Sequence, residues 1–200
     1  KKIYIIAEAG VNHNGDKKTA IKLIDQGIAA GANAVKFQIF KAENLVTKNA
    51  SKAKYQIKKT KLKETQFEML KSLELPRNVY FELKDHCEKQ NIDFLITAFD
   101  EESLDFIINK LKVKKLKIPS GEITNGPFIL QHALSGLDII LSTGMANLNE
   151  IKKALSIIAY GYLNKHKKNK INLKDITKSY ESAKGKKILK TPDLFGGFFL

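Results

Sequence analysis

The chain has 200 residues, of which 43% are hydrophobic, and a formal net charge of +14 at pH 7. This length and apolar content suffice for one folded domain with a core. A single cysteine, Cys87, excludes an internal disulfide bond, and Glu8 interrupts the first apolar stretch too early for a secretion signal or a membrane span. These features predict a cytoplasmic protein without a membrane segment.

More than half of the excess positive charge lies near the end of the chain. Residues 164–190 hold ten lysines against Asp175 and Glu181, and we expect the Lys- and Asn-rich segment 164–175 to be a solvated loop. Lysine is poor material for bidentate recognition of bases, and the segment NKHKKNKINLKD has no aromatic side chains on which bases could stack. We therefore expect no dedicated nucleic-acid partner, and a basic module that binds polyanions is kept as an alternative.

Short apolar runs alternate along the chain with stretches of helical periodicity. The runs that predict strands are IYIIA (3–7), AVKFQIF (34–40), FLITAF (94–99), KLKIP (115–119) and DIILS (138–142). The stretches that predict helices are 16–30, 64–75, 77–91, 101–111, 126–136 and 147–163. This alternating order predicts an α/β fold in which helices cover a parallel sheet, and we expect that sheet to close as a (β/α) barrel.

About five βα units account for residues 1–163, whereas a complete (β/α)8 TIM barrel usually needs about 250 residues. No sixth strand of comparable quality follows in the sequence. We therefore expect the N-terminal part of a TIM barrel at 1–163, followed at 164–200 by a lysine-rich insertion and an abnormal or truncated end.

Capping residues and apolar stripes refine the expected helices. Asp16 is expected to cap the first helix, Gly31 to end it, and Asn147 or Asn149 to cap the last. The inward stripe expected of the last helix is Leu148, Ile151, Leu155 and Ile158. The connection 41–63 exceeds the usual length of a βα loop and is expected to cover a functional site.

Each apolar run stops at polar side chains suited to anions and sugars. These residues are Glu8, Lys36, Gln38, Thr97, Ser120, Glu122, Ser142 and Thr143. In a closed (β/α) barrel the active site is built from the C-terminal ends of the strands. The sequence therefore predicts that these residues share one end of the barrel.

The alternation of side chains along a strand decides which lysines point inward. In AVKFQIF the apolar residues alternate with Lys36 and Gln38, so the two polar side chains share the inner face. The same parity turns Lys117 inward in KLKIP. A buried ammonium group is costly without a counter-charge, so we predict that Lys36 and Lys117 converge on one phosphorylated anion. The alternative is that either lysine only pairs with a carboxylate such as Glu8 or Glu122.

Five motifs together give the chain a family resemblance. They are IAEAGVNHNGD (6–16), AVKFQIFKAENLVT (34–47), FLITAFD (94–100), KIPSGEITNGPF (117–128) and ILSTGMANLNEI (140–151). With these motifs the chain resembles the sialic acid synthase family, which includes the N-acetylneuraminate and N,N'-diacetyllegionaminate synthases. The pair Tyr55 and Gln56 in the long loop, together with the YGYL helix end, is more similar to the bacterial legionaminate enzymes.

The resemblance implies an enzyme that condenses phosphoenolpyruvate with an N-acetylated hexosamine on a TIM barrel. It also implies a homodimer of the full-length protein, swapped through a C-terminal antifreeze-like domain that this chain lacks. The residues expected to hold phosphoenolpyruvate are Lys36, Thr97, Lys117 and Ser120. The residues expected at the sugar are Gln38 and Glu122, with Glu8 next to the aldehyde and the metal. Glu8, Lys36 and Glu122 are the implied catalytic residues.

The resemblance further implies a divalent metal, Mn2+ or Mg2+, that polarises the aldehyde as a Lewis acid. The family's metal-binding histidines lie on later strands, which this chain lacks. His13 in the first loop is expected to be a structural hydrogen-bonding residue, and His86, His132 and His166 to lie on helix or loop surfaces.

Two alternatives to this enzyme remain open from the sequence. One is another phosphoenolpyruvate-dependent synthase of 3-deoxy sugar acids on the same barrel. The other is a truncated half-barrel with exposed strand edges, which would not catalyse the condensation alone.

Overall fold

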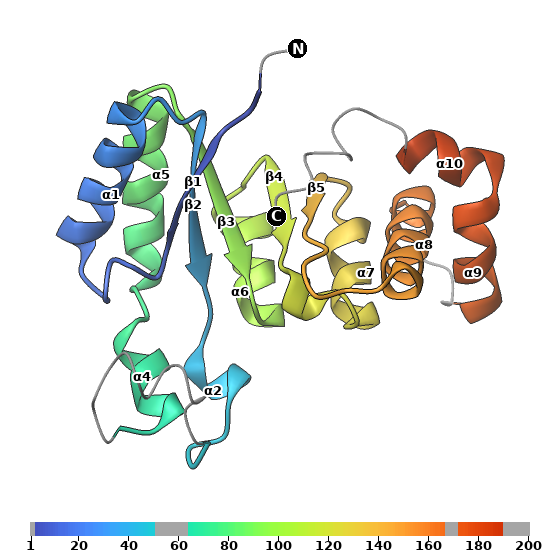
Figure 1. The fold of residues 1–200 in the computed structure, drawn as a ribbon, viewed down its shortest axis with the longest axis horizontal. Helices are drawn as coiled ribbons and strands as arrows, with labels where there is room; N and C mark the ends of the chain where they lie inside the picture. Colours follow the sequence, from blue (N-terminus) through green and yellow to red (C-terminus); the bar gives the residue numbers. More distant parts are fainter. Residues whose placement is uncertain (1–2, 51–63, 167–171, 190–200) are drawn as a thin grey trace. The chain divides into compact units, whose positions relative to one another are not determined.

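The computed structural model of the chain describes residues 3–50, 64–166 and 172–189 (Figure 1). The chain divides into two compact units, Lys1–Leu111 and Lys112–Leu200, which we call unit 1 and unit 2. No helix in the described part of the chain is long and apolar enough to cross a membrane.

Unit 1 is built on a parallel three-stranded sheet. Its strands are β1 (Ile6–Gly10), β2 (Ala34–Ile39) and β3 (Asp93–Ala98), in the order β1-β2-β3. Helices α1 (Lys17–Ala29) and α5 (Arg77–Lys89) lie side by side on one face of this sheet (Figure 1). Each strand is thus followed along the chain by helical structure, as the sequence predicts.

The apolar side chains of β2 are buried, as the alternating pattern requires. Val35 and Phe37 are fully buried, and Ile39 is 3% exposed. Gly27 of α1 permits close packing on this strand, because a Cβ atom there would lie 2.7 Å from Cγ2 of Val35. The face of β2 that carries Val35 and Phe37 therefore forms the core, and the other face is left for Lys36 and Gln38.

The predicted ends of α1 are confirmed. The Asp16 side chain accepts a hydrogen bond from the backbone N–H of Thr19, which caps the helix. Gly31 follows the helix with a φ of +76°, a left-handed conformation that glycine adopts at no steric cost.

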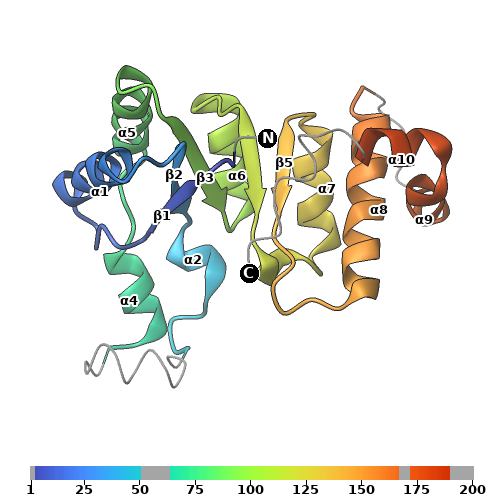
Figure 2. The same ribbon diagram turned by 45° about the horizontal axis from the view of Figure 1, so that its top comes forward.

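Shorter helices complete unit 1. Figure 2 shows α2 (Ala42–Leu45) beside α4 (Gln66–Ser72), which begins with a reciprocal capping box between Thr65 and Glu68. After β3, α6 (Glu101–Asp105) continues into a π-helical turn at Phe106–Lys110. Residues 51–63 of the long connection lie outside the described residues, so the expectation that this loop covers a site stays a prediction.

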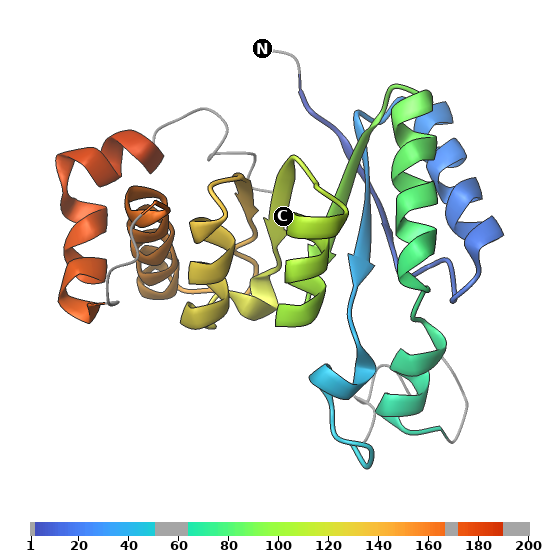
Figure 3. The same cartoon turned by 180° about the vertical axis from the view of Figure 1, so that it is seen from behind.

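Unit 2 begins with two parallel strands, β4 (Lys115–Ile118) and β5 (Asp138–Leu141). A 3-10 turn at Ser120–Glu122 leads to α7 (Gly126–Leu134), and α8 (Leu148–Asn164) follows β5. Figure 3 shows α7 packed beside α8. Gly161 permits this contact, since a Cβ atom there would lie 2.4 Å from Cβ of Ala133. No strand follows β5 within the residues that the structure describes, in agreement with the sequence.

The segment expected to be a solvated loop, 164–175, runs into a helix, so this prediction was wrong for residues 173–175. Helix α9 (Leu173–Glu181) begins there, α10 (Ala183–Leu189) follows it, and both helices pack against α8. Lys174 and Lys178 are exposed, whereas Ser179 is buried. The exposed lysines therefore lie on the solvent face of an amphipathic helix. The net charge of the segment gave no indication of the buried face. The expected abnormal end at 190–200 lies outside the described residues.

Two further expectations for unit 2 were wrong. Leu148, expected to face inward, is 75% exposed because it stands at the first position of α8, directly after the capping residue Asn147. His132, expected on a helix surface, is fully buried in α7. The cap at Asn147 and the burial of Ile158 are confirmed.

Candidate functional site

In unit 1 the strand pairing brings together the residues predicted to form a site. Glu8 lies opposite Lys36 in the pairing of β1 with β2, and Gln38 lies opposite Thr97 in the pairing of β2 with β3. By strand alternation these four residues share the sheet face opposite Val35 and Phe37. The structure therefore confirms the parity argument for Lys36 and Gln38.

Lys36 forms an ion pair with Glu8. The distance between Lys36 Nζ and Glu8 Oε2 is 2.6 Å, and the side chains are 11% and 54% exposed, respectively. This contact is the one that the pairing alternative expects, and the assignment of Lys36 to an anionic ligand stays a prediction. Because the Glu8 carboxylate is half-exposed, solvent and small ligands have access to one side of the pair, while the ammonium is screened from bulk water.

A β-bulge lets Glu8 and Gln38 approach the same place. The register between β1 and β2 shifts between Glu8 and Gly10, and Gly10 has a φ of +55°. A Cβ atom on Gly10 would lie 3.2 Å from Glu8 Oε1 and 3.6 Å from Gln38 Nε2. Glycine at this position therefore leaves space for a carboxylate and an amide side by side at the strand ends.

Thr97 carries an unsatisfied polar group. Its side chain is 1% exposed, and Oγ1 has no hydrogen-bond partner among the described residues. A buried hydroxyl without a partner costs about 1–3 kcal/mol. This hydroxyl lies on the same sheet face as Gln38 and Lys36 and is available to donate a hydrogen bond to an oxygen of a ligand.

His13 has a structural role, as the sequence predicts. Its Nδ1 accepts a hydrogen bond of 3.1 Å from the backbone N–H of Gly15, and its ring lies 6.2 Å from that of Phe37. Burial lowers the pKa of His13, and the nearby Asp16 carboxylate opposes this shift. The imidazole is therefore held neutral inside the first loop.

In unit 2, Lys117 forms hydrogen bonds at the strand ends. Its Nζ donates a hydrogen bond of 3.1 Å to the backbone carbonyl of Ile118 and a further one to Oγ of Ser142. Ser120 faces the loop after β5, because a Cβ atom on Gly144 would lie 3.5 Å from its Oγ. Lys117, Ser120 and Ser142 thus lie around the C-terminal ends of β4 and β5.

Glu122 lies at the last position of the 3-10 turn, where its carboxylate accepts a hydrogen bond of 2.8 Å from Nδ2 of Asn125. Lys36 belongs to unit 1, whereas Lys117 and Glu122 belong to unit 2. The convergence of the two lysines on one anion therefore stays a prediction, as do the roles assigned to all seven residues.

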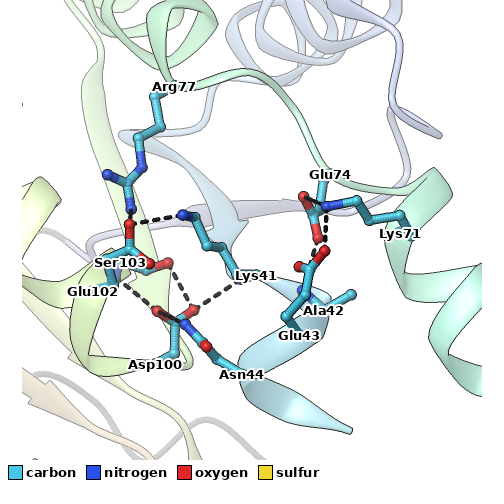
Figure 4. Close-up of polar contacts among 10 residues, drawn as sticks. All are labelled: Lys41, Ala42, Glu43, Asn44, Lys71, Glu74, Arg77, Asp100, Glu102 and Ser103. Carbon is cyan, nitrogen blue, oxygen red and sulfur yellow. Dashed lines mark hydrogen bonds and ion pairs between the residues drawn. The ribbon is translucent and has the colours of Figure 1, made fainter. Parts of the chain in front are cut away.

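Sequence reasoning missed two residues that fix the strand ends of unit 1. The Tyr80 hydroxyl donates a hydrogen bond of 3.0 Å to the backbone carbonyl of Gln38. The Asp100 carboxylate accepts one of 2.9 Å from the backbone N–H of Lys41 (Figure 4). The signal for Asp100 was present in the sequence, since an Asp directly before the helical stretch EESLD is a typical N-cap.

No group of three or more His, Cys, Asp or Glu side chains able to hold a metal ion exists among the described residues. Glu8 is a single carboxylate whose Oε2 is already paired with Lys36. The described residues therefore do not by themselves build a centre for Mn2+ or Mg2+.

Comparison with solved structures places this geometry in a class of proteins. The chain superposes with a TM-score of 0.65 on an N-acetylneuraminic acid synthetase from Leptospira borgpetersenii, at 34% identity over 81% of this chain and 52% of that one. A spore coat polysaccharide biosynthesis protein, SpsE of Bacillus subtilis, gives 0.62 at 32% identity over 80% and 41%. The fold is therefore that of the (β/α)-barrel sugar-acid synthases, present here in part, as the sequence predicts.

Comparison of sequences identifies the family. The NeuB family profile matches residues 23–191. The chain is 49% identical over 180 residues to the N,N'-diacetyllegionaminic acid synthase of Campylobacter jejuni, covering 90% of this chain and 53% of that protein. The corresponding protein of Legionella pneumophila is 48% identical over 161 residues, covering 80% and 45%. The chain belongs to the NeuB family, which confirms the resemblance, and it spans about half the length of these curated relatives.

Proposed function

We propose that this chain forms the substrate-binding strand ends of a nonulosonic acid synthase. The reaction condenses phosphoenolpyruvate with an N-acetylated hexosamine to give a nine-carbon 2-keto sugar acid and phosphate. The observation that carries the proposal is a buried ammonium, Lys36, on the same sheet face as the unsatisfied buried hydroxyl of Thr97. Membership of the NeuB family supports it, since matched relatives are named for legionaminic and sialic acids.

The proposed phosphoenolpyruvate site uses charge and hydroxyl groups. Lys36 meets an anionic group of the substrate, and Thr97 donates to one of its oxygens. Lys117 and Ser120 are proposed, on the family resemblance alone, to hold phosphoenolpyruvate as well. Such charge-assisted hydrogen bonds are about twice as strong as neutral ones and are suited to an anion that keeps its charge throughout the reaction.

The proposed sugar site lies next to the Glu8–Lys36 pair. Gln38 and Glu122 bind sugar hydroxyls, and Glu8 lies near the aldehyde. C3 of phosphoenolpyruvate attacks the aldehyde carbon, a water molecule adds at C2, and phosphate leaves with cleavage of the C2–O bond. The half-exposed Glu8 carboxylate is accessible to the reacting groups.

A divalent metal, Mn2+ or Mg2+, belongs to the proposal through the family alone. Its ligands would have to come from outside the described residues, because these hold no suitable group of three side chains. A homodimer and a cytoplasmic location are proposed for the full-length protein on the same ground.

A chimera tests the proposal. This chain would replace the matching 180 residues of the Campylobacter jejuni relative, to which it is 49% identical. We expect the purified chimera to release phosphate from phosphoenolpyruvate only when a suitable N-acetylated hexosamine and Mn2+ are present. A panel of hexosamines that differ in the 6-hydroxyl and in a second acetamido group identifies the substrate. A soluble, folded chimera without phosphate release on any hexosamine would refute the proposal.

A further inference from the structure

Asp100 is a buried carboxylate directly beyond the end of β3. The residue is 7% exposed. Its carboxylate accepts four hydrogen bonds from the described residues. Two come from Ser103, with distances of 2.8 Å from the backbone N–H and 2.7 Å from Oγ. The other two come from far earlier in the chain, 2.9 Å from the backbone N–H of Lys41 and 3.3 Å from Nδ2 of Asn44 (Figure 4).

The contact with Lys41 extends the strand pairing. The last backbone bond between the ends of β2 and β3 runs from Phe99 N–H to the Ile39 carbonyl, at 3.2 Å. The next donor on the β2 side, the N–H of Lys41, bonds to the Asp100 side chain instead of to backbone. The carboxylate therefore holds the β2 chain one step beyond the regular ladder, three residues after Gln38 and Thr97 on the two strands.

The turn that follows depends on such contacts from other segments. Helix α2 has four residues, too few for stability by helical hydrogen bonding alone. Glu74 accepts a hydrogen bond of 2.7 Å from the Ala42 N–H, and Lys71 bridges Glu74 and Glu43 at 3.0 and 2.8 Å (Figure 4). Asp100 and Glu74 thus hold two successive backbone N–H groups at the start of α2.

Capping alone does not require an aspartate here. Asn caps helices about as well as Asp, because one side-chain oxygen suffices to accept from the first turn. Asp100 uses its second oxygen, Oδ2, for the Lys41 N–H. In an Asn variant that kept Oδ1 on the Ser103 N–H, the amide NH2 would face the Lys41 N–H, placing donor against donor. Asp100→Asn therefore separates the cap of α6 from the hold on β2.

We propose that Asp100 is a positioning residue, which fixes the C-terminal end of β2 and the start of α2 so that Lys36 and Gln38 keep their geometry toward substrate. The inference rests on the proposed function for its consequence but not for its structural part. Asp100 acts through the backbone of Lys41, and it is not assigned to contact substrate.

Amide hydrogen exchange of the chain, measured residue by residue by NMR, tests the structural part. In Asp100→Asn we expect exchange at Lys41 and Ala42 to accelerate about tenfold or more, with the protected amides of α1 and α5 unchanged. In parallel, titration with phosphoenolpyruvate is expected to show about fivefold or greater weakening of binding in Asp100→Asn relative to the unmodified chain. The matched control is Glu102→Gln, which loses the same charge two residues away but only its exposed contacts with Lys41 Nζ and Arg77.

The outcomes separate the inference from the proposed function. Unchanged exchange at Lys41, or acceleration that spreads through α1 and α5, overturns the positioning role, because the first shows no hold and the second a general loss of stability. Equal weakening of phosphoenolpyruvate binding in Glu102→Gln also overturns it. Absence of phosphoenolpyruvate binding by the unmodified chain refutes the proposed function for this chain, whereas local acceleration at Lys41 still upholds the hold of Asp100 on β2.

Discussion

Unit 1 and unit 2 both bury ionisable side chains, but in different surroundings. In unit 1, Lys36 lies on a sheet face at the strand ends, beside a half-exposed carboxylate and the unsatisfied hydroxyl of Thr97. In unit 2, His132 lies inside a helix, with Nδ1 2.8 Å from the Phe128 carbonyl and its ring 4.6 Å from that of Phe128. The comparison teaches that burial alone does not identify a site. Lys36 is buried beside a half-exposed carboxylate, which is the premise of the proposed site, whereas His132 is enclosed by helix packing and its burial bears on stability.

The largest effect is expected from acid acting on unit 2. Burial lowers the pKa of His132 from 6.5 to about 4, and the hydrogen bond to Phe128 opposes this shift. Since the folded pKa is below the unfolded one, the unfolded state gains the proton first. Stability is complete above about pH 6.5 and is lost as the pH falls toward 4, by up to about 3 kcal/mol.

Thermal unfolding followed by circular dichroism between pH 7.5 and 4 measures this loss. His132→Gln should flatten the dependence, because it removes the group whose pKa is lowered by burial. An unchanged dependence in His132→Gln would contradict this assignment.

The next largest effect is expected on the binding of phosphoenolpyruvate near Lys36 of unit 1. In the chimera, Lys36→Ala should raise the KM for phosphoenolpyruvate by about tenfold or more, because a charge-assisted contact contributes about 1.5–3 kcal/mol. The KM for the hexosamine should change much less. Lys22→Ala removes an exposed lysine of α1 and serves as the matched control. Equal changes in both KM values would count against the assignment of Lys36 to the anion.

Two closely packed glycines, Gly161 in unit 2 and Gly27 in unit 1, allow the packing of the two units to be compared. Gly161→Ala should destabilise unit 2 by about 1–3 kcal/mol, because the new Cβ would lie 2.4 Å from Ala133 Cβ and 3.1 Å from its backbone carbonyl carbon. Gly27→Ala in unit 1 should cost less, since its closest contact is a side-chain methyl of Val35. Gly121→Ala, which meets nothing within 4 Å, is the control in chemical denaturation. A larger loss in Gly27→Ala than in Gly161→Ala would contradict this ranking.

The smallest effect is expected at the second lysine. Ser142→Ala removes one acceptor of Lys117 and should destabilise the chain by about 0.5–1.5 kcal/mol. Lys117 retains the Ile118 carbonyl as an acceptor, so the fold should be unchanged. Urea unfolding measures the difference, with Ser156→Ala on the exposed side of α8 as the comparison. A loss several times larger would mean that Ser142 holds more of the loop after β5 than this one contact.

Much of the fold and the shared sheet face of Lys36 and Gln38 could be predicted because they depend on short-range rules. Strand alternation placed Lys36 and Gln38 on one face, and capping chemistry located Asp16 and Asn147. The Lys36–Glu8 pair was kept as an alternative, since both residues stand at equivalent strand ends.

The predictions that were wrong or lacking concern residues whose environment is set by tertiary packing and not by the local sequence pattern. His132 sits among Phe128, Ile129 and Ala133, which are all buried, and this mostly apolar helix was a signal of burial that the prediction for His132 did not use. The start of α9 was predicted to be a loop because the segment is rich in lysine. The hold of Asp100 on Lys41 joins residues 59 positions apart, a distance at which no local pattern operates.

The π-helical turn at Phe106–Lys110 has a consequence for chain length. The Leu111 N–H bonds to the Phe106 carbonyl at 2.9 Å, five residues back, so this turn holds one residue more than an α-helical turn. Both ends of the turn are nevertheless buried, Phe106 at 5% and Leu111 at 2% exposure. Deletion of the exposed Asn109 would allow ordinary helical bonding while keeping both anchors in the core. Homologous chains that are one residue shorter here should therefore fold alike, and an alignment gap belongs inside this turn.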